Sequence, residues 1–476
     1  KFATFFIQTQ CFLRIYLHKL IFKANFCNFI KILLMKFALV FFSFLFFSPS
    51  LIGQEGFQYF SKKERVTIPF QFINNLIFIP LKVNGVDLTF LLDTGVEESI
   101  LFSLEDKEEL KFNNVEKIKL RGLGSSDFIE GLKSSGNQVV FKDAIVDQKH
   151  DIYIILDEEF NFSGSVGIPV NGIIGYQFFR NFKVEINYLT QKIYIHNPSK
   201  EIKKRKINKF LEVDIFFHNN KPYYSSQFEF EDQKVDGKLL LDIGNSDAFW
   251  FFSNRIKNYT FSNQSFEDFL GKGFNGDIFG KRTKLDSFSF ENFRFKNPYV
   301  AIPDSTSLYN IKWAENRIGS IGGEVFKRFN IIFDYKNSKL YLKKNKKFND
   351  PFEYNMSGIE INHAGLQWIQ EEVKMNILTT DKTSYENLTK GSDSFKYKFV
   401  LKPIYIIANI RKDSPADLCG LKKGDIIVSI NSHGTDRYSL QEVNNLLKSQ
   451  DGKKINFEVD RGNRRMQFTF YLKSIL

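Results

Sequence analysis

Short apolar runs separated by turn residues dominate the chain between about residue 60 and residue 350. The runs are rich in β-branched and aromatic residues and end at Asn-Gly, Gly or Asp, which is typical of strands. In the first half the expected strands are 65–72, 76–83, 88–92, 138–146, 152–156, 183–187 and 192–196. A second strand-rich block spans about 210–344. The pattern therefore predicts a mainly β protein.

Two segments of these blocks repeat each other. Residues 172–195 and 319–342 align over 24 positions without a gap. Just after the shared glycines, at 176–181 and 323–328, the sequence predicts a short helix. Such an internal repeat indicates that one half of the molecule resembles the other. Eight positions are identical: Gly172/Gly319, Ile174/Ile321, Gly175/Gly322, Phe179/Phe326, Phe182/Phe329, Tyr188/Tyr335, Lys192/Lys339 and Tyr194/Tyr341.

An aspartate in an apolar frame precedes each repeat. Residues 91–95 read Leu-Leu-Asp-Thr-Gly, and residues 240–244 read Leu-Leu-Asp-Ile-Gly. A carboxylate between a buried strand and a glycine turn is held at a fixed depth. If Asp93 and Asp242 face each other, their like charges resist simultaneous ionisation, so one stays protonated while the other is a base. Such a pair can activate a water without a metal, a cofactor or a covalent intermediate.

With these motifs, the chain from about residue 60 onward resembles the pepsin-like and retropepsin-like aspartic proteases. In overall layout it resembles bacterial secreted proteins that join such a protease to a PDZ domain. The resemblance implies two homologous pepsin-like lobes related by a pseudo-two-fold axis, with Asp93 and Asp242 as the catalytic pair. The residues that would shape the active loops are Thr94, Gly95, Ile174 and Gly175 in the first lobe and Ile243, Gly244, Ile321 and Gly322 in the second.

Two positions depart from the family pattern. In the family, Thr or Ser hydroxyls brace the two active loops against each other, and Ile243 has no hydroxyl. Because one of the two bracing hydroxyls is missing, we expect the two active loops to be held less firmly against each other. Ser320 also places a polar residue where the first lobe has Ile173.

Two other interpretations of the aspartates stay open. Most Asp-x-Gly triplets are turns in which the carboxylate bonds its own loop. The chain could also keep the protease fold as a catalytically weak or inactive peptide-binding scaffold.

Glycine-bearing segments at 122–126 and 271–276 lie where the family has substrate-covering flaps. The candidate flap residues are Gly122, Gly124 and Gly273, and an ordinary flexible turn is the alternative for each. Trp250 and Phe251 follow the second aspartate, and we expect them in the core, with the lining of a pocket as the alternative.

The C-terminal block changes character at residues 414–431. A short helix after Pro415 is expected to end at Gly420, followed by a strand at 425–430. Ser439 and Glu442 form a capping box ahead of a second helix, and strands at 454–460 and 465–472 close the domain.

This order of elements resembles the PDZ domains attached to bacterial secreted proteases. The resemblance implies an α+β domain that adds a peptide C-terminus or an internal strand to a groove between a strand and a helix. Val443 and Leu447 would contact the peptide, and Gly365 and Leu366 in the segment 364–367 are the candidates for the loop that receives a terminal carboxylate. The alternative is a domain that docks on the protease lobes themselves.

A run of apolar residues at 37–47 follows Met35-Lys36 and leads to Gly53, which is typical of a secretory signal and too short for a preferred membrane span. We interpret 1–34 as a non-native upstream extension, with a longer unusual leader as the alternative, and 35–53 as the signal peptide. The expected domains are lobe one at 54–199, a basic linker at 200–209, lobe two at 210–348 and the PDZ domain at 349–476, with an insertion near 379–394. The protein is expected to be secreted or to stay in the periplasm or cell envelope, without a stable membrane span after cleavage.

Charge and motifs narrow the function further. The whole chain carries +12, and residues 1–53 hold six Lys or Arg and no acid, which leaves 12 − 6 = +6. This mild excess does not suggest a nucleic-acid partner. His-Glu-x-x-His and Gly-x-Ser-x-Gly are missing from the sequence, which argues against zinc peptidases and serine hydrolases. The sequence therefore predicts a secreted aspartic endopeptidase that acts on peptide or protein substrates.

Overall fold

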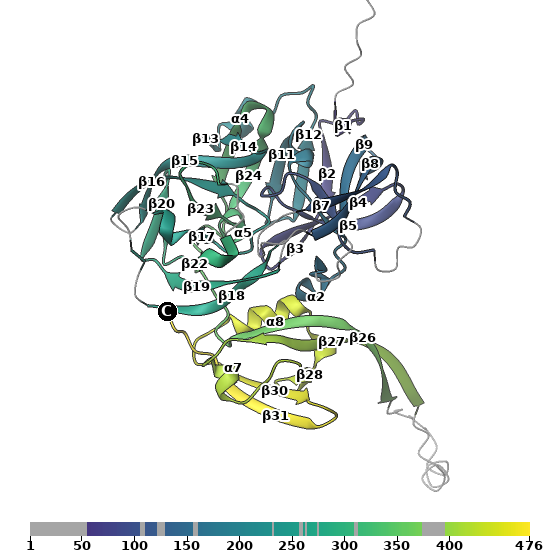
Figure 1. Ribbon diagram of the computed structural model, residues 1–476, viewed down its shortest axis with the longest axis vertical. Coiled ribbons are helices and arrows are strands. Elements are labelled where there is room, and N and C mark those ends of the chain that lie inside the picture. The colour runs from purple at the N-terminus through teal and green to yellow at the C-terminus, as the bar shows by residue number, and fades with distance from the viewer. Residues whose placement is uncertain are drawn as a thin grey trace, which may run out of the picture. The chain divides into compact units, whose positions relative to one another are not determined.

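The computed structural model describes residues 55–104, 110–120, 129–155, 160–230, 233–256, 260–261, 264–273, 276–308, 313–373 and 396–476. The expected upstream extension, signal peptide and insertion near 379–394 lie outside these ranges. The described residues form four sheets and a few short helices (Figure 1). The prediction of a mainly β protein is confirmed.

The first lobe is built on a nine-stranded sheet. Its order is β1-β9-β6-β10-β5-β4-β8-β7, with β3 paired to β4. Short helices α2 (Ser163–Val166) and α3 (Tyr176–Phe179) flank β10 along the chain. The strands are β1 (Gln58–Tyr59), β3 (Gln71–Ile73), β4 (Leu76–Val83), β5 (Val86–Leu92), β6 (Ser99–Leu101), β7 (Val115–Leu120), β8 (Ile129–Phe141), β9 (Ile145–Ile155) and β10 (Gly172–Ile174).

The second lobe has a ten-stranded sheet in the order β18-β19-β22-β17-β23-β16-β15-β20-β21, with β14 on β15. Its helices are α5 (Gly323–Phe326), η2 (Ser253–Arg255) and η3 (Ser305–Leu308). The strands are β14 (Phe216–His218), β15 (Lys221–Phe230), β16 (Gln233–Leu241), β17 (Phe249–Phe251), β18 (Ser265–Gly273), β19 (Gly276–Lys284), β20 (Ser287–Phe290), β21 (Phe293–Lys296), β22 (Tyr299–Pro303) and β23 (Arg317–Ile321).

A six-stranded sheet joins the lobes, and three of its strands come from each. The order is β13-β25-β24-β11-β12-β2, so β11 and β24 pair across the junction. The strands are β2 (Arg65–Pro69), β11 (Lys183–Asn187), β12 (Lys192–His196), β13 (Leu211–Asp214), β24 (Phe329–Asp334) and β25 (Lys339–Lys344), with η4 (Tyr335–Asn337) between the last two.

The register of β11 on β24 reproduces the sequence repeat as a two-fold symmetry. The repeat relates each residue to one 319 − 172 = 147 positions later. Glu185 pairs with Ile332, its own equivalent in the repeat. Lys183 pairs with Asp334, the equivalent of Asn187, and Asn187 pairs with Asn330, the equivalent of Lys183. The pseudo-two-fold axis therefore passes between Glu185 and Ile332. The sheet at this axis contains strands of both lobes, which the expected division into lobes at 54–199 and 210–348 did not predict.

The expected linker at 200–209 is not a plain solvated connector. It contains the helix α4 (Lys204–Ile207), and the Lys206 ammonium pairs with the buried carboxylate of Glu185. His196 also lies 2.9 Å from the same carboxylate. The basic segment is thus attached to the sheet at the two-fold axis, because a buried carboxylate requires a cationic or hydrogen-bonding partner.

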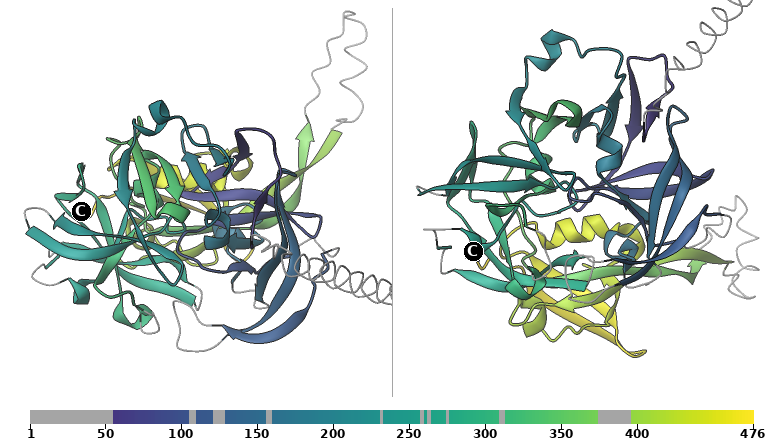
Figure 2. Two further views of the ribbon diagram at one scale, coloured as in Figure 1. Left: turned by 90° about the horizontal axis from the view of Figure 1, so that it is seen from above. Right: turned by 45° about the horizontal axis from the view of Figure 1, so that its top comes forward.

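The PDZ domain has its own sheet and its own hydrophobic core, whereas one core runs through both lobes. Its long β26–β27 hairpin projects from the domain (Figure 2). The capping box of Ser439 and Glu442 is formed, and Gly420 adopts a φ of +91° directly after the first helix, as predicted. The elements are β26 (Ile359–Val373), β27 (Lys396–Ile410), α7 (Pro415–Leu418), β28 (Ile426–Ile430), β29 (His433–Gly434), η5 (Thr435–Arg437), α8 (Leu440–Leu447), β30 (Lys454–Asp460) and β31 (Arg465–Tyr471). Among the described residues, no helix combines the length and the apolar character needed to cross a membrane.

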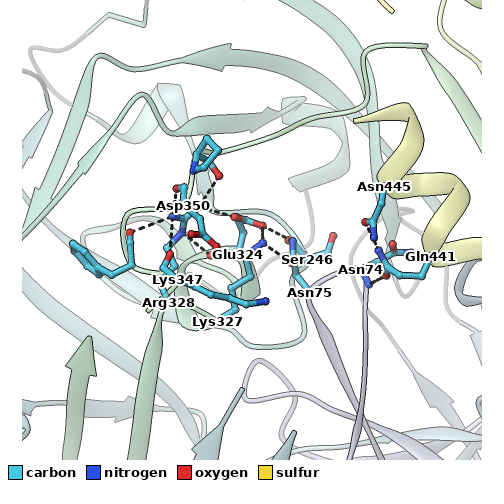
Figure 3. Close-up of polar contacts among 12 residues, drawn as sticks. Asn74, Asn75, Ser246, Glu324, Lys327, Arg328, Lys347, Asp350, Gln441 and Asn445 are labelled. Atoms are coloured by element: carbon cyan, nitrogen blue, oxygen red, sulfur yellow. Dashed lines mark hydrogen bonds and ion pairs between the residues drawn. The ribbon is translucent and has the colours of Figure 1, made fainter. Parts of the chain in front are cut away.

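A buried arginine anchors the segment that leads from the second lobe to the PDZ domain (Figure 3). Arg328 is fully buried, and its guanidinium lies 2.7 Å from Glu324 and donates to the carbonyls of Phe348 and Pro351. Glu324 also accepts a hydrogen bond from the side-chain amide of Asn75, in the first lobe, at 2.7 Å. The network therefore joins both lobes to the connecting segment.

We expect Arg328→Met to lower the free energy of unfolding by about 3–5 kcal/mol, because the change leaves Glu324 and several buried carbonyls without their partner. Urea unfolding followed by tryptophan fluorescence measures the loss. Arg294→Met removes an exposed arginine on β21 and is the matched control, with an expected change of about 0.5 kcal/mol or less. Equal stability of the two variants would contradict the anchoring role.

Candidate active site

Each aspartate stands at the end of a strand that runs beside its repeat segment. Leu92 pairs in parallel with Ile174, and Leu241 pairs with Ile321. The Asp93 amide donates to the Ile174 carbonyl at 2.9 Å, and the Asp242 amide donates to the Ile321 carbonyl at the same distance. The two loops are therefore built alike, as the repeat predicts.

The second glycine of each repeat is required by close packing. A Cβ at Gly175 would stand 2.0 Å from the carbonyl oxygen of Val96, and one at Gly322 would stand 2.2 Å from that of Asp247. These backbone atoms belong to the aspartate loops and cannot move aside independently. Gly175 and Gly322 thus let the repeat segments pass directly behind the active loops.

The two carboxyl groups face each other at the junction of the lobes. The Gly95 amide donates to Asp93 Oδ1 at 2.6 Å, and the Gly244 amide donates to Asp242 Oδ1 at 3.1 Å. A Cβ placed on Gly95 would lie 2.9 Å from Asp242 Oδ1 and 3.0 Å from Asp93 Oδ1. Both oxygens therefore border one small space, and a hydrogen bond links the two side chains.

The environment raises the pKa of both carboxyls but not equally. Burial raises the pKa of Asp93 well above its ordinary value, and the charge of Asp242 raises it further. Burial also raises the pKa of Asp242, but Arg317, the hydrogen bond from Asp93 and Lys221 all oppose that rise. Since the opposing cations act mainly on Asp242, the shared proton belongs on Asp93 and the negative charge on Asp242.

One arm of the expected brace between the loops is present. The Thr94 hydroxyl, fully buried, donates to the Leu241 carbonyl at 2.6 Å and accepts from the Ile243 amide at 3.0 Å. Ile243 is also fully buried and has no hydroxyl with which to return these bonds to the first loop. The asymmetry predicted from the sequence is confirmed, and the remaining arm still joins the two loops directly.

The dyad opens into a cleft of about 1890 Å³ that both lobes line. The β18–β19 hairpin borders it with Gly273, which fits the candidate flap of the second lobe. Gly122 and Gly124 lie outside the described residues. Phe251 is in the core as expected, but Trp250 lines the cleft and donates to Asp247 at 2.8 Å.

The predicted peptide contacts of the PDZ domain need correction. Gly365 and Leu366 do not form a loop: they lie at a bulge inside β26, because the strand continues through them in its pairing with β27. Val443 and Leu447 are fully buried in the PDZ core, since they occupy the inner face of α8. The α8 residues that line the cleft are Asn444 and Lys448.

The PDZ domain contacts the first lobe at β26 and α8, and α8 is the helix that was expected to border the peptide groove. A Cβ on Gly164 of the α2 region would lie 3.0 Å from the His363 carbonyl on β26, and one on Gly167 would lie 2.9 Å from Leu440 on α8. The backbone amide of Asn74 donates to the side-chain oxygen of Gln441 on α8 at 2.5 Å (Figure 3). These contacts support the alternative of docking on the lobes, and they bring the groove to the edge of the cleft.

Two cationic residues of the cleft were missed by sequence reasoning. Lys221 opens β15 and Arg317 opens β23, and both line the cleft near Asp242. Extending the repeat backwards by two positions sets Arg317 against the buried Val170, since 317 − 147 = 170. A charge opposite an apolar residue of the other half was the signal that could have revealed Arg317.

Family models match two separate parts of the chain. Residues 79–178 match the aspartyl protease family model, and residues 406–461 match the PDZ domain model. Among solved structures, the crystal structure of aspartic proteinase from Irpex lacteus aligns with 60% of this chain and 99% of that chain, at 12% identity and a TM-score of 0.40. A search of the curated proteins gave no significant match. The chain thus combines an aspartic-protease-like domain with a PDZ domain near its C-terminus.

Proposed function

We propose that the protein is an aspartic endopeptidase in which Asp93 and Asp242 activate a water against a peptide bond. The observation that carries the proposal is the buried carboxyl pair, held by equivalent glycine amides at the end of a cleft lined by both lobes. Its environment separates the two pKa values, which is what an acid and a base in one site require.

In the proposed reaction the ionised Asp242 takes a proton from the water as the water oxygen attacks the scissile carbonyl carbon. Protonated Asp93 gives its proton to the carbonyl oxygen, which yields a neutral tetrahedral intermediate. The intermediate collapses when the amide nitrogen receives the proton held on Asp242, the C–N bond breaks, and the diol hydroxyl returns a proton to Asp93. Protons and electrons balance without any further reactant.

The PDZ domain has a proposed role in recruiting or positioning peptide. Glu360 and Asn362 on β26, together with Asn444 and Lys448 on α8, line the same cleft as the dyad. A segment added to β26 would therefore lead toward the carboxyl pair. The single-armed brace at Ile243 favours a second candidate, a catalytically weak scaffold that captures peptides in this cleft.

We expect Asp93→Asn and Asp242→Asn each to lower kcat/KM by at least about a thousandfold, because neither a lone acid nor a lone base can complete the proton transfers. Cleavage of a mixed peptide library, followed by mass spectrometry, measures the loss. Unchanged thermal unfolding shows that each variant is folded. Cleavage that survives both single changes would refute the dyad, and peptide capture without cleavage by the unaltered protein would favour the scaffold.

The pH profile of kcat/KM should be bell-shaped. Activity is lost as the pH falls through the pKa of Asp242, which becomes protonated, and as it rises through the raised pKa of Asp93, which becomes ionised. Because Lys221 lowers the pKa of both carboxyls, Lys221→Met should move both limbs toward higher pH. Lys234→Met on the exposed part of β16 is the control and should leave the profile unmoved. A shift of the limbs in opposite directions would contradict this electrostatic account.

Export is also proposed, on the strength of the signal-like segment at 35–53. Expression of the full sequence in a secreting bacterial host should yield a protein that begins close to residue 54. N-terminal sequencing of the exported protein tests this, and retention of the apolar segment in a cytoplasmic product would contradict it.

A further inference from the structure

Arg317 is a buried cation beside the dyad. The residue is only 9% exposed, and its Nε donates to the Gly319 carbonyl at 3.3 Å. The guanidinium carbon lies 5.2 Å from the ring centre of Phe252, 5.6 Å from that of Trp313 and 5.8 Å from that of Tyr223. Aromatic faces offset part of the cost of burying a positive charge, but they do not neutralise it.

Two other arginines of the lobes with little exposed surface have carboxylate partners. Arg328 lies 2.7 Å from Glu324, and Arg282 lies 2.7 Å from both Asp247 and Asp268. Across the part of the chain that the structure describes, no carboxylate oxygen comes within 4.0 Å of the Arg317 guanidinium or the Lys221 ammonium. Asp242 acts on both cations only from a longer range, and Tyr223 gives Arg317 a hydrogen bond but no charge, so two cations of the cleft face one ionised carboxylate of the dyad.

Strand register places this charge next to the reacting centre. Leu240 pairs with Tyr223 on one side and with Ser320 on the other, and Ser320 pairs with Trp250. Side chains two apart on a strand share a face, so this row lies on the face from which Asp242 projects. Arg317 pairs with Lys238, two residues before Leu240, across a register shift between the strands, and it lines the cleft together with Lys221.

We propose that Arg317 and Lys221 form a subsite for an acidic side chain of the substrate, next to the scissile bond on the Asp242 side of the cleft. The inference rests on the proposed function and adds the substrate class. A Glu or Asp side chain would supply the missing carboxylate, and Arg317 could bind it through both terminal nitrogens. A neutral side chain of the same size would leave the buried guanidinium without this ion pair, which is the kind of loss that yields strong discrimination.

Arg317 could instead act on Asp242 alone, by favouring its ionised form. That role changes the rate equally for every substrate, whereas a subsite changes the ratio between substrates. The two roles are therefore separated by a ratio of kcat/KM values measured with one enzyme.

The test uses pairs of peptides that differ only in Glu against Gln at one position, taken in turn on each side of the cleaved bond. At the subsite position the unaltered protein should cleave the Glu peptide about 10- to 100-fold more efficiently than its Gln partner. Arg317→Met should bring this ratio close to one, and Arg317→Lys should keep part of it. Arg294→Met is the matched control: Arg294 is exposed on β21 and does not line the cleft, so the ratio should persist.

Equal cleavage of the Glu and Gln peptides at every position by the unaltered protein would overturn the subsite, and this comparison depends on no variant. A ratio that survives in folded Arg317→Met would overturn the role of Arg317. If neither peptide is cleaved, the proposed function fails separately, and calorimetric binding of the same pair decides the subsite. Tighter binding of the Glu peptide that is lost in Arg317→Met or weakened in Arg317→Lys supports it, and equal binding overturns it.

Discussion

Two carboxyl groups buried against each other would repel, and the architecture of both lobes holds them together. Ionising both in a poorly solvated space is unfavourable, so the pair retains a proton. The geometry is maintained by backbone amides of Gly95 and Gly244, by repeat segments that pass directly behind the loops, and by the Thr94 hydroxyl across the junction. The shared sheet makes this possible, because β11 and β24 place the halves of the repeat about one axis.

The backbone is symmetric where the chemistry is not. Equivalent strands and amide bonds hold Asp93 and Asp242, but Thr94 faces Ile243 and Val170 corresponds to Arg317. A fully symmetric dyad gives no reason for the proton to prefer either carboxyl. The cations near Asp242 supply that reason, and the same unpaired charge gives the cleft a preference among substrates under our proposal.

Much of this could be predicted from the sequence because it depends on local signals. The strand pattern, the capping box at Ser439 and the glycine after α7 are set by neighbouring residues, and the repeat identified the two loops together. The shared sheet escaped prediction because the pairing of β11 with β24 joins residues far apart in the chain. The helix α4 escaped because its 4 residues are too few to show a helical period. Val443 and Leu447 showed helical spacing, but spacing alone cannot tell a core-facing residue from a groove-facing one when both are apolar.

The contacts of the PDZ domain differ in kind on its two sides. Toward the second lobe, Tyr354 packs on Phe266 and Tyr299, and Arg411 lies 3.6 Å from the largely buried Asp268. Toward the first lobe, the α2 region packs closely on β26 and on Leu440, and Asn74 adds hydrogen bonds with Gln441 and Asn444 that water can replace at little cost. Apolar and buried ionic contacts are costly to separate, so the second lobe is the anchor. The contacts toward the first lobe border β26 and α8, so a peptide that passes between groove and cleft must displace them.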